Sequence, residues 1–205
     1  MRPNLFANTP DILHAYLQQG GRPAFEARLL LAATLGANYG IYNGFELCEN
    51  RAMPGTEEYV DSEKYQVRHW DWNQAGNIKG LVARVNQIRR RNRALHVDRT
   101  LRFHATDNPQ IIAYSKTSTD RSNVVLVVVN LDPRHMQHGY VQVPLDSLRS
   151  LGAGPLAERP RDADATYIAH DLIDDTQYRW HGEWNYVRLD PCVRQGHIFR
   201  LTRQA

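Results

Sequence analysis

The hydrophobic positions give the first part of the chain a helical periodicity. In residues 23–35 and 78–91 the apolar side chains recur every three or four positions, which is the spacing of one helix face. A shorter helix is predicted over residues 11–19, ended by a pair of glycines, and short apolar strands are predicted over residues 5–7 and 39–42. This strand–helix–strand order predicts a parallel α/β arrangement. It is too short to close a barrel, which needs about eight such units.

The pattern changes after residue 92 to short β-rich runs separated by turn residues. A run of apolar residues at 124–129 has no polar face, as expected of a central strand. Short strands at this spacing predict an antiparallel β-sandwich. We therefore expect two domains, residues 1–98 and residues 99–205. The predicted strands are 111–114, 124–129, 140–143, 167–172 and 197–201.

Composition and charge add few constraints. The net charge of +3 is too small to indicate nucleic-acid binding, and no run approaches the roughly 18 apolar residues of a membrane span. The N-terminal residues lack the apolar core of a signal peptide, and the two cysteines have neither metal-site nor disulfide spacing. These features lead us to expect a cytoplasmic protein with no nucleic-acid or membrane partner, no metal and no cofactor.

One long segment, Tyr39 to Trp72, combines many aromatic and acidic residues with little helix or strand periodicity. A segment of this length is typically functional or disordered. Its five aromatic residues from Phe45 to Trp72 argue against disorder, because disordered segments contain few of them. We interpret it as a structured loop over a site.

Three motifs identify a resemblance that covers nearly the whole chain, from about Asn4 to His197. They are YGIYNGFELCEN from residue 39, EYVDSEKYQ from residue 58 and VVVNLDP from residue 127. The chain resembles the C-terminal part of the bacterial alpha-1,4-glucan:maltose-1-phosphate maltosyltransferases, which belong to the alpha-amylase-type family 13. The resemblance implies that residues 1–98 form the last two βα units of a (β/α)8 barrel. It implies that residues 99–205 form a C-terminal antiparallel β-sandwich.

Asp11 is the candidate catalytic residue. It follows a predicted strand by a few residues, and the active sites of barrel enzymes lie just beyond the carboxyl ends of the strands. Without the resemblance, the favoured explanation of Asp11 is an acid in the first turn of a helix, where the helix dipole stabilises it. NTPD resembles the family motif that holds the third catalytic carboxylate. The resemblance therefore implies that Asp11 stabilises the oxocarbenium-like transition state.

Lys64 and Tyr65 are the candidate substrate-binding pair. A lysine supplies a point charge and a tyrosine a hydroxyl donor, and both suit a phosphate group. The resemblance implies that they bind the phosphate of maltose 1-phosphate. The alternative is a surface lysine paired with Glu63 or Asp61, worth under about 1 kcal/mol.

Other polar residues are poorer candidates. Glu46 and Glu49 are three positions apart and could form an acid/base pair. We reject this reading because the resemblance implies that the nucleophilic aspartate and the acid glutamate lie on earlier barrel strands. We expect Glu46 to be a buried hydrogen-bond partner. Trp70 and Trp72 could stack on glucose rings, but packing is the preferred interpretation.

The resemblance implies a retaining transfer of maltosyl units from maltose 1-phosphate to an alpha-1,4-glucan by an enzyme expected to be a homodimer. Because nothing before Asn4 can supply the nucleophile and the acid/base, we expect the chain to be a C-terminal fragment that is inactive alone. Two alternatives stay open. One is a remnant of a family 13 hydrolase, and the other is a non-catalytic, carbohydrate-associated sandwich module.

Overall fold

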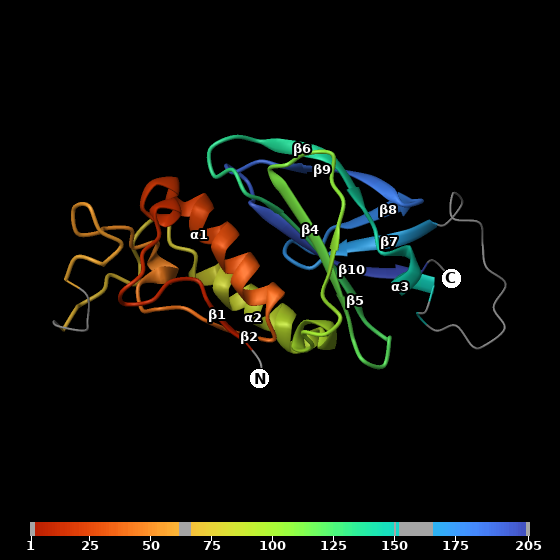
Figure 1. Ribbon diagram of the computed structural model, residues 1–205, viewed down its shortest axis with the longest axis horizontal. Coiled ribbons are helices and arrows are strands. Elements are labelled where there is room, and N and C mark those ends of the chain that lie inside the picture. Colours follow the sequence, from red (N-terminus) through yellow and green to blue (C-terminus); the bar gives the residue numbers. More distant parts are fainter. Residues whose placement is uncertain (1–2, 62–66, 150, 152–165, 204–205) are drawn as a thin grey trace.

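A computed structural model describes residues 3–61, 67–149, 151 and 166–203. Figure 1 shows two long helices, α1 (Ala15–Leu35) and α2 (Lys79–Arg91), lying against a β-rich half of the molecule. Strands β1 (Asn4–Phe6) and β2 (Asn38–Gly40) lie on the other side of the helices. The short 3-10 helices η1 (Phe45–Leu47) and η2 (Arg93–His96) and helix α3 (Leu145–Arg149) complete the helical elements.

The predicted strand–helix–strand order is present. β1 and β2 pair in parallel, with Leu5 opposite Tyr39, and α1 connects them. β1 has the predicted length but lies one residue earlier than predicted, and β2 is one residue shorter than the predicted strand 39–42. Phe6 is 51% exposed, so β1 is not the buried strand that its apolar residues indicated.

Helix α1 corrects the predicted helix boundaries. The helix begins at Ala15 instead of Asp11, and the Nδ1 atom of His14 accepts a hydrogen bond from the backbone N–H of Tyr16. The predicted break at the glycine pair is a kink: Gly21 has φ of 60°, a left-handed conformation that glycine adopts without a steric penalty. The residues after the kink are the most deeply buried part of the helix.

The β-rich half contains two antiparallel sheets. The larger sheet has the strand order β3-β4-β5-β10-β7-β8, and the smaller one pairs β6 with β9. The structure confirms all five predicted strands of this region and adds β3, β8 and β9. The bounds are β3 (Arg102–His104), β4 (Ile111–Thr117), β5 (Val124–Asn130), β6 (Gln137–Gln142), β7 (Thr166–Asp171), β8 (Gln177–His181), β9 (Trp184–Leu189) and β10 (Gly196–Arg203).

Strand β5 is buried on both faces, as the sequence predicted. Successive side chains of a strand point to opposite faces. Val125, Val127 and Val129 belong to the core shared with α1 and α2. The alternate residues, Val124, Leu126 and Val128, belong to a second core with β6 and β9. The six-stranded sheet is therefore the middle layer between the helices and the smaller sheet.

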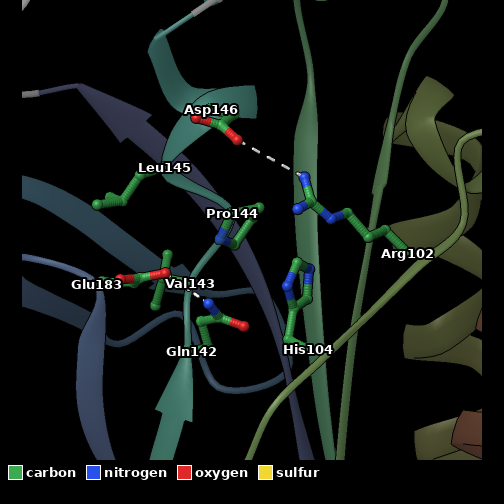
Figure 2. Close-up of a pocket in the computed structure, with 8 residues that line it drawn as sticks. All are labelled: Arg102, His104, Gln142, Val143, Pro144, Leu145, Asp146 and Glu183. Atoms are coloured by element: carbon green, nitrogen blue, oxygen red, sulfur yellow. Dashed lines mark hydrogen bonds and ion pairs between the residues drawn. The ribbon is translucent and has the colours of Figure 1, made fainter. Parts of the chain in front are cut away.

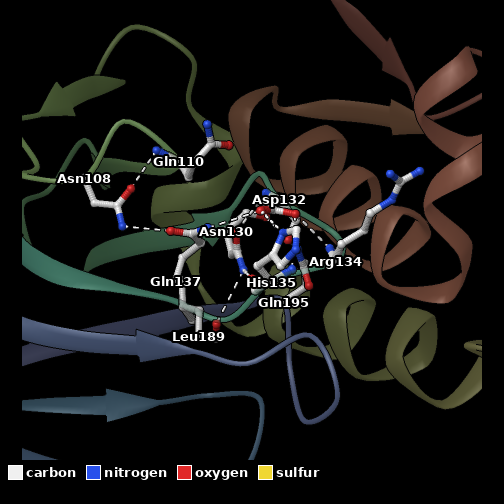
Figure 3. A network of polar contacts seen from close by, with 9 residues as sticks. All are labelled: Asn108, Gln110, Asn130, Asp132, Arg134, His135, Gln137, Leu189 and Gln195. Atoms are coloured by element: carbon white, nitrogen blue, oxygen red, sulfur yellow. Dashed lines mark hydrogen bonds and ion pairs between the residues drawn. The ribbon is translucent and has the colours of Figure 1, made fainter.

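The VVVNLDP motif connects the sheet to α1. Figure 3 shows that the side chain of Asn130 fixes the following loop: its Oδ1 accepts from the N–H of Asp132 at 2.8 Å, and its Nδ2 donates to the carbonyl of His135 at 3.0 Å. Gln195 Nε2 donates to the carbonyl of Asn130 at 2.9 Å. The loop places Pro133 against Gly20, where a Cβ atom would approach its ring to 3.0 Å.

The carboxyl end of α1 is bound by side chains from three other segments. Arg89 Nη2 donates to the carbonyl of Ala37 at 2.7 Å, and Lys116 Nζ donates to the carbonyl of Leu35 at 3.0 Å. Asp98 Oδ1 accepts from the N–H of Ala37 at 2.6 Å. The lysine thereby satisfies a carbonyl group that the helix end leaves unpaired, and the other two contacts fix the backbone of Ala37 just beyond the helix. Burial lowers the pKa of Lys116 to about 8.

Candidate functional site

The candidate site lies at the carboxyl ends of β1 and β2. Asn8 follows β1, and the segment beginning at Tyr42 follows β2. In sheets with parallel strands, ligands bind in the crevice beyond the carboxyl ends of the strands. The NTPD motif and the long aromatic segment are therefore neighbours at the edge where a binding site is expected.

Asn8 joins three segments at this edge. Its side chain is 2% exposed. The Oδ1 atom accepts from the backbone N–H of Tyr42 at 2.8 Å, and the Nδ2 atom donates to the hydroxyl of Tyr59 at 2.6 Å. The rings of Tyr42 and Tyr59 lie 5.6 Å apart. Burial raises the pKa of the Tyr59 hydroxyl, so this group remains neutral and can accept the hydrogen bond.

Asp11 lies at the exposed tip of the turn that follows Asn8. The backbone closes this turn with two hydrogen bonds between Thr9 and Ile12, each 3.2 Å long. The first turn of α1 contains no acidic residue. The alternative explanation of Asp11 as an acid that complements the dipole of a helix is therefore wrong.

A buried ion pair organises the aromatic segment beyond β2. Arg68 Nη2 lies 3.2 Å from Glu49 Oε2, and both side chains are nearly buried. Arg51 Nε donates to the same carboxylate at 2.9 Å from the surface. Burial alone would raise the pKa of Glu49, but the hydrogen bonds and charge of Arg51, helped by Arg68, lower it overall. Glu49 is therefore a fixed anion.

Lys64 and Tyr65 lie outside the described residues, but the described flanks of their segment are close together. Arg68 Nη1 donates to the carbonyl of Val60 at 3.4 Å, and the N–H of Val60 donates to the carbonyl of Arg51 at 3.0 Å. The guanidinium of Arg68 also stacks 4.1 Å from the centre of the Trp70 ring. Arg68 thus connects both ends of the segment that carries the predicted phosphate ligands.

Sequence reasoning assigned no role to Arg68, and it was partly wrong about Glu46. The backbone carbonyl of Glu46 accepts from the N–H of Ile78 at 2.8 Å. Its buried Oε2 atom, however, has no hydrogen-bond partner within the described ranges. Trp70 packs against Gly44, as the packing interpretation predicted, whereas Trp72 is 43% exposed.

A small polar cavity in the sandwich is a weaker candidate. Figure 2 shows Arg102, His104 and Asp146 at its wall, with the Arg102 guanidinium 3.8 Å from the Asp146 carboxylate. His104 Nε2 lies 2.7 Å from the hydroxyl of Ser115. Burial, helped by the charge of Arg102, lowers the pKa of His104 to about 4. These groups pair with one another and have no metal-binding arrangement; the residues that the structure describes contain no cluster of three or more His, Cys, Asp or Glu able to hold a metal.

The fold resembles alpha-amylases. The alpha-amylase of Geobacillus thermoleovorans, in a crystal structure with acarbose, superposes with a TM-score of 0.65 at 12% identity, covering 98% of this chain and 39% of that chain. An Anoxybacillus alpha-amylase gives a TM-score of 0.63 at 12% identity, covering 98% of this chain and 38% of that one. This likeness shows a fold of the alpha-amylase type.

Sequence comparison gives more specific matches than the fold does. Residues 103–201 match the family model described as "GLGE, C-terminal". The alpha-1,4-glucan:maltose-1-phosphate maltosyltransferase of Rhodospirillum rubrum is 50% identical over 202 residues, covering 98% of this chain and 28% of the relative. Maltosyltransferase 2 of Streptomyces coelicolor is 50% identical over 208 residues, covering 99% of this chain and 29% of the relative. The chain matches the C-terminal part of these maltosyltransferases over nearly its whole length. It spans well under half the length of these relatives.

Proposed function

We propose that this chain is the C-terminal part of a retaining enzyme that transfers maltosyl units. The donor is α-maltose 1-phosphate, the acceptor is the non-reducing end of an α-1,4-glucan, and phosphate is released. The observation that carries the proposal is 50% identity over 98% of this chain to the Rhodospirillum rubrum maltosyltransferase. Because the chain covers 28% of that relative, the activity belongs to the longer protein.

Residues 1–98 are proposed to form the last two βα units of a (β/α)8 barrel, and residues 99–205 its C-terminal sandwich. The parallel β1–β2 pair, the connecting helix α1 and the following helix α2 support this assignment. The exposed ring of Phe6 on β1 is explained if earlier barrel strands pack beside this pair.

Asp11 is proposed to stabilise the transition state. Its turn projects beyond the carboxyl end of β1. Asn8, which precedes the turn, is held by hydrogen bonds to Tyr42 and Tyr59. A carboxylate held in place before the reaction stabilises developing positive charge on the sugar without reorganisation. Asp11 acts in this way on both the formation and the breakdown of the glycosyl-enzyme.

Lys64 and Tyr65 are proposed to bind the phosphate of the donor. Their segment begins and ends near Arg68, whose hydrogen bond to the carbonyl of Val60 holds the described flanks together. An ammonium group and a phenol hydroxyl both donate hydrogen bonds to phosphate oxygens. The negative charge of the leaving phosphate is thereby stabilised as the bond to the sugar breaks.

The proposed reaction is a double displacement. A carboxylate nucleophile from the preceding part of the enzyme attacks the anomeric carbon, and the bond to phosphate breaks. The 4-hydroxyl of the glucan then attacks the same carbon, loses its proton to the acid/base carboxylate and releases the nucleophile. The two carboxylates of a retaining enzyme lie about 5 Å apart, and the two inversions give net retention.

The cellular location and the oligomeric state of the enzyme are proposed from the same resemblance. We place it in the cytoplasm as a homodimer. Cys48 and Cys192 form no disulfide, which agrees with a reducing compartment. Among the described residues, no helix is both long enough and apolar enough to cross a membrane.

Substitution of Lys64 tests the proposed donor. In the enzyme that contains the preceding barrel, Lys64→Ala is expected to raise the KM for maltose 1-phosphate about tenfold or more and to leave the KM for the glucan nearly unchanged. The matched control is Lys79→Ala at the start of α2, which removes a lysine outside the EYVDSEKYQ motif and is expected to change neither constant.

The alternatives predict other results. A hydrolase of the alpha-amylase type has no need of a phosphate-binding pair, so equal effects of Lys64→Ala on both constants would favour it. The hydrolase alternative is supported by the fold alone, since the amylases are 12% identical to this chain. The non-catalytic module predicts that the sandwich folds without residues 1–98.

A further inference from the structure

A polar cleft of about 450 Å³ lies beside the turn between β4 and β5. Its walls are formed by this turn, by the residues just before β3 and by the start of α3. Every side chain that lines the cleft carries a charge or a hydroxyl group. The charged ones are Arg99, Arg121 and Asp146. A cleft of this composition suits a small hydrophilic ligand.

The cleft lies away from the proposed transfer site. The turn between β4 and β5 joins the carboxyl end of α2, where Asn123 Oδ1 accepts from the N–H of Ala94 at 3.0 Å. The loop that follows β2 joins the other end, where the N–H of Ile78 donates to the carbonyl of Glu46 at 2.8 Å. The 13 residues of α2 span about 20 Å between them. Figure 1 shows the two regions beyond opposite ends of this helix.

The cleft has an excess of positive charge. The carboxylates beside it are already paired with other cations. Asp120 Oδ2 lies 3.2 Å from Arg93 Nη1, and Asp146 Oδ2 lies 3.8 Å from Arg102 Nη1 (Figure 2). In the part of the chain that the structure describes, neither of the two arginines that line the cleft forms an ion pair. An anionic ligand could therefore bind these two guanidinium groups without displacing a carboxylate.

Arg99 and Thr119 present hydrogen-bond donors at the mouth of the cleft, and both are exposed. Arg99 Nη2 donates to Thr119 Oγ1 at 3.2 Å, so the hydrogen of this hydroxyl is left to donate to a ligand. The guanidinium carries further N–H groups that can donate as well. Phosphate oxygens are strong acceptors for such donors.

Arg121 occupies a backbone position that favours glycine. Its φ of 56° is left-handed, a conformation that glycine adopts without a steric penalty and other residues do not. Hydrogen bonds fix the turn. The N–H of Arg121 donates to the carbonyl of Ser118 at 2.9 Å, and Asp120 Oδ1 accepts from the Ser118 hydroxyl at 2.6 Å. Backbone strain of this kind clusters at sites where ligands bind.

We propose that this cleft binds a phosphate group, either as free phosphate or as part of a small phosphorylated metabolite. Arg99 and Arg121 are its cationic ligands, and the Thr119 hydroxyl is a third donor. A phosphate monoester carries about 1.5 to 2 negative charges at pH 7, and a guanidinium can donate two parallel N–H groups to its oxygens. The binding does not depend on the proposed transfer reaction, because all three ligands lie within the described part of the 205-residue chain.

The first test titrates the isotope-labelled 205-residue chain with inorganic phosphate and follows its backbone amide signals by NMR at constant ionic strength. The signals of Thr119 and Arg121 are expected to shift to saturation. Arg121→Gly and Arg99→Gln are each expected to weaken this binding about tenfold. Arg179→Gln is the matched control, because Arg179 is an exposed arginine of β8 that does not line the cleft. Signals near Lys64 report separately on the proposed donor site.

Arg121→Gly separates the loss of a ligand from the loss of structure. Glycine relieves the left-handed backbone, so the thermal midpoint is expected to stay the same or rise while phosphate binding falls. Three results would each overturn the proposal. They are no saturable shift at the cleft of the unaltered chain, the same shifts with chloride at equal ionic strength, and an unchanged phosphate affinity in both arginine variants.

A second titration identifies the source of the phosphate group, with glucose 6-phosphate and glucose as probes. Tighter binding of glucose 6-phosphate than of inorganic phosphate would support a phosphorylated metabolite as the ligand, and equal or weaker binding would support free phosphate. Glucose is expected not to bind. Binding of glucose as tight as that of glucose 6-phosphate would overturn the proposal, because the phosphate group would then contribute nothing.

Discussion

At the scale of single residues, the geometry around Asp11 depends on a buried neighbour. Asn8 is hydrogen-bonded through both ends of its amide, to the N–H of Tyr42 and to the hydroxyl of Tyr59. Moving Asn8 would leave these buried polar groups unpaired, at a cost of about 1–3 kcal/mol each. The start of the turn that carries Asp11 therefore resists rearrangement. This rigidity suits a carboxylate whose proposed role is electrostatic.

Asp11→Asn tests this role, because it preserves the size of the side chain and removes its charge. In the enzyme with the preceding barrel, kcat is expected to fall about 10²–10³-fold, because the lost interaction belongs to the transition state. Steady-state phosphate release measures the effect. Asp71→Asn is the matched control, since Asp71 is also an exposed turn aspartate. A kcat equal to that of the unaltered enzyme would remove Asp11 from the catalytic machinery.

His104 makes the stability of the sandwich depend on pH. Its folded-state pKa is lowered to about 4 by burial, whereas an unfolded histidine titrates near about 6.5. As pH falls from about 6.5 towards 4, protons bind the unfolded state first, so stability is lost. Between pH 7 and pH 5 this histidine is expected to cost the unaltered chain about 1–2 kcal/mol of its free energy of unfolding. His104→Gln is expected to abolish this cost. Urea denaturation at both pH values measures it, with exposed His69→Gln as the control; identical pH dependence in all three proteins would refute the assignment.

The sequence suggested single candidate residues but not the side-chain pairs that hold them. Asp11 could be proposed because it belongs to a motif that follows a strand. The hydrogen bond from Asn8 to Tyr59 spans 51 residues, and the bond from Arg68 to Glu49 spans 19. No local pattern brings such partners together, because a helix or strand period relates only residues that lie close together in the sequence. The roles of Asp11, Lys64 and Tyr65 stay predictions.

At the scale of elements, helix α1 lies unusually close to the sheet at Gly196. A Cβ atom at this position would lie 2.6 Å from the carbonyl oxygen of Val128 and 2.8 Å from Leu30 Cδ1. The glycine therefore lets β10 pass beneath the helix while pairing with β5. Larger side chains would push the helix or the neighbouring strand away.

Gly196→Ala is expected to destabilise the chain by about 1–3 kcal/mol through this overpacking. Gly80→Ala is the matched control: Gly80 lies in α2, and its added Cβ would meet nothing within 4 Å. Alanine favours a helix more than glycine does, so this variant is expected to gain up to about 1 kcal/mol. Denaturation midpoints measure both. Equal stability of Gly196→Ala and the unaltered chain would show that the helix can shift at little cost.

Elements with strong periodicity were predictable, and exposed ones were not. The apolar run of β5 and the helical face of α2 were both found from the sequence. Strands β8 and β9 were missed because they alternate single buried residues, such as Trp180 and Val187, with exposed aromatic and charged ones. The helix predicted from Asp11 was wrong because the NTPD segment closes a tight turn on itself before α1 begins.

At the scale of the whole molecule, one hydrophobic core crosses the predicted domain boundary at residue 98. It contains the buried face of α1 together with Val125, Val127, Val129 and Ile198 from the sheet. The hydroxyls of Thr34 and Tyr114 lie 2.6 Å apart across the same contact. The sandwich therefore depends on the helices for one of its two covered faces.

Residues 99–205 expressed alone are therefore expected to show no cooperative thermal transition. Exposing four large apolar side chains costs about 6–12 kcal/mol, which is comparable with the total stability of about 5–15 kcal/mol of a typical domain. Calorimetry of this piece beside the 205-residue chain makes the comparison. A cooperative transition at the same midpoint in both would instead support an independent sandwich module.

The most direct test of the central claim is phosphate release from maltose 1-phosphate in the presence of an α-1,4-glucan. The 205-residue chain is assayed beside a longer protein that carries a barrel matching the relatives. The predicted result is that the longer protein releases phosphate and lengthens the glucan in maltosyl steps, and that the 205-residue chain does neither. Release by the 205-residue chain above a boiled control, or by neither protein, would contradict the account.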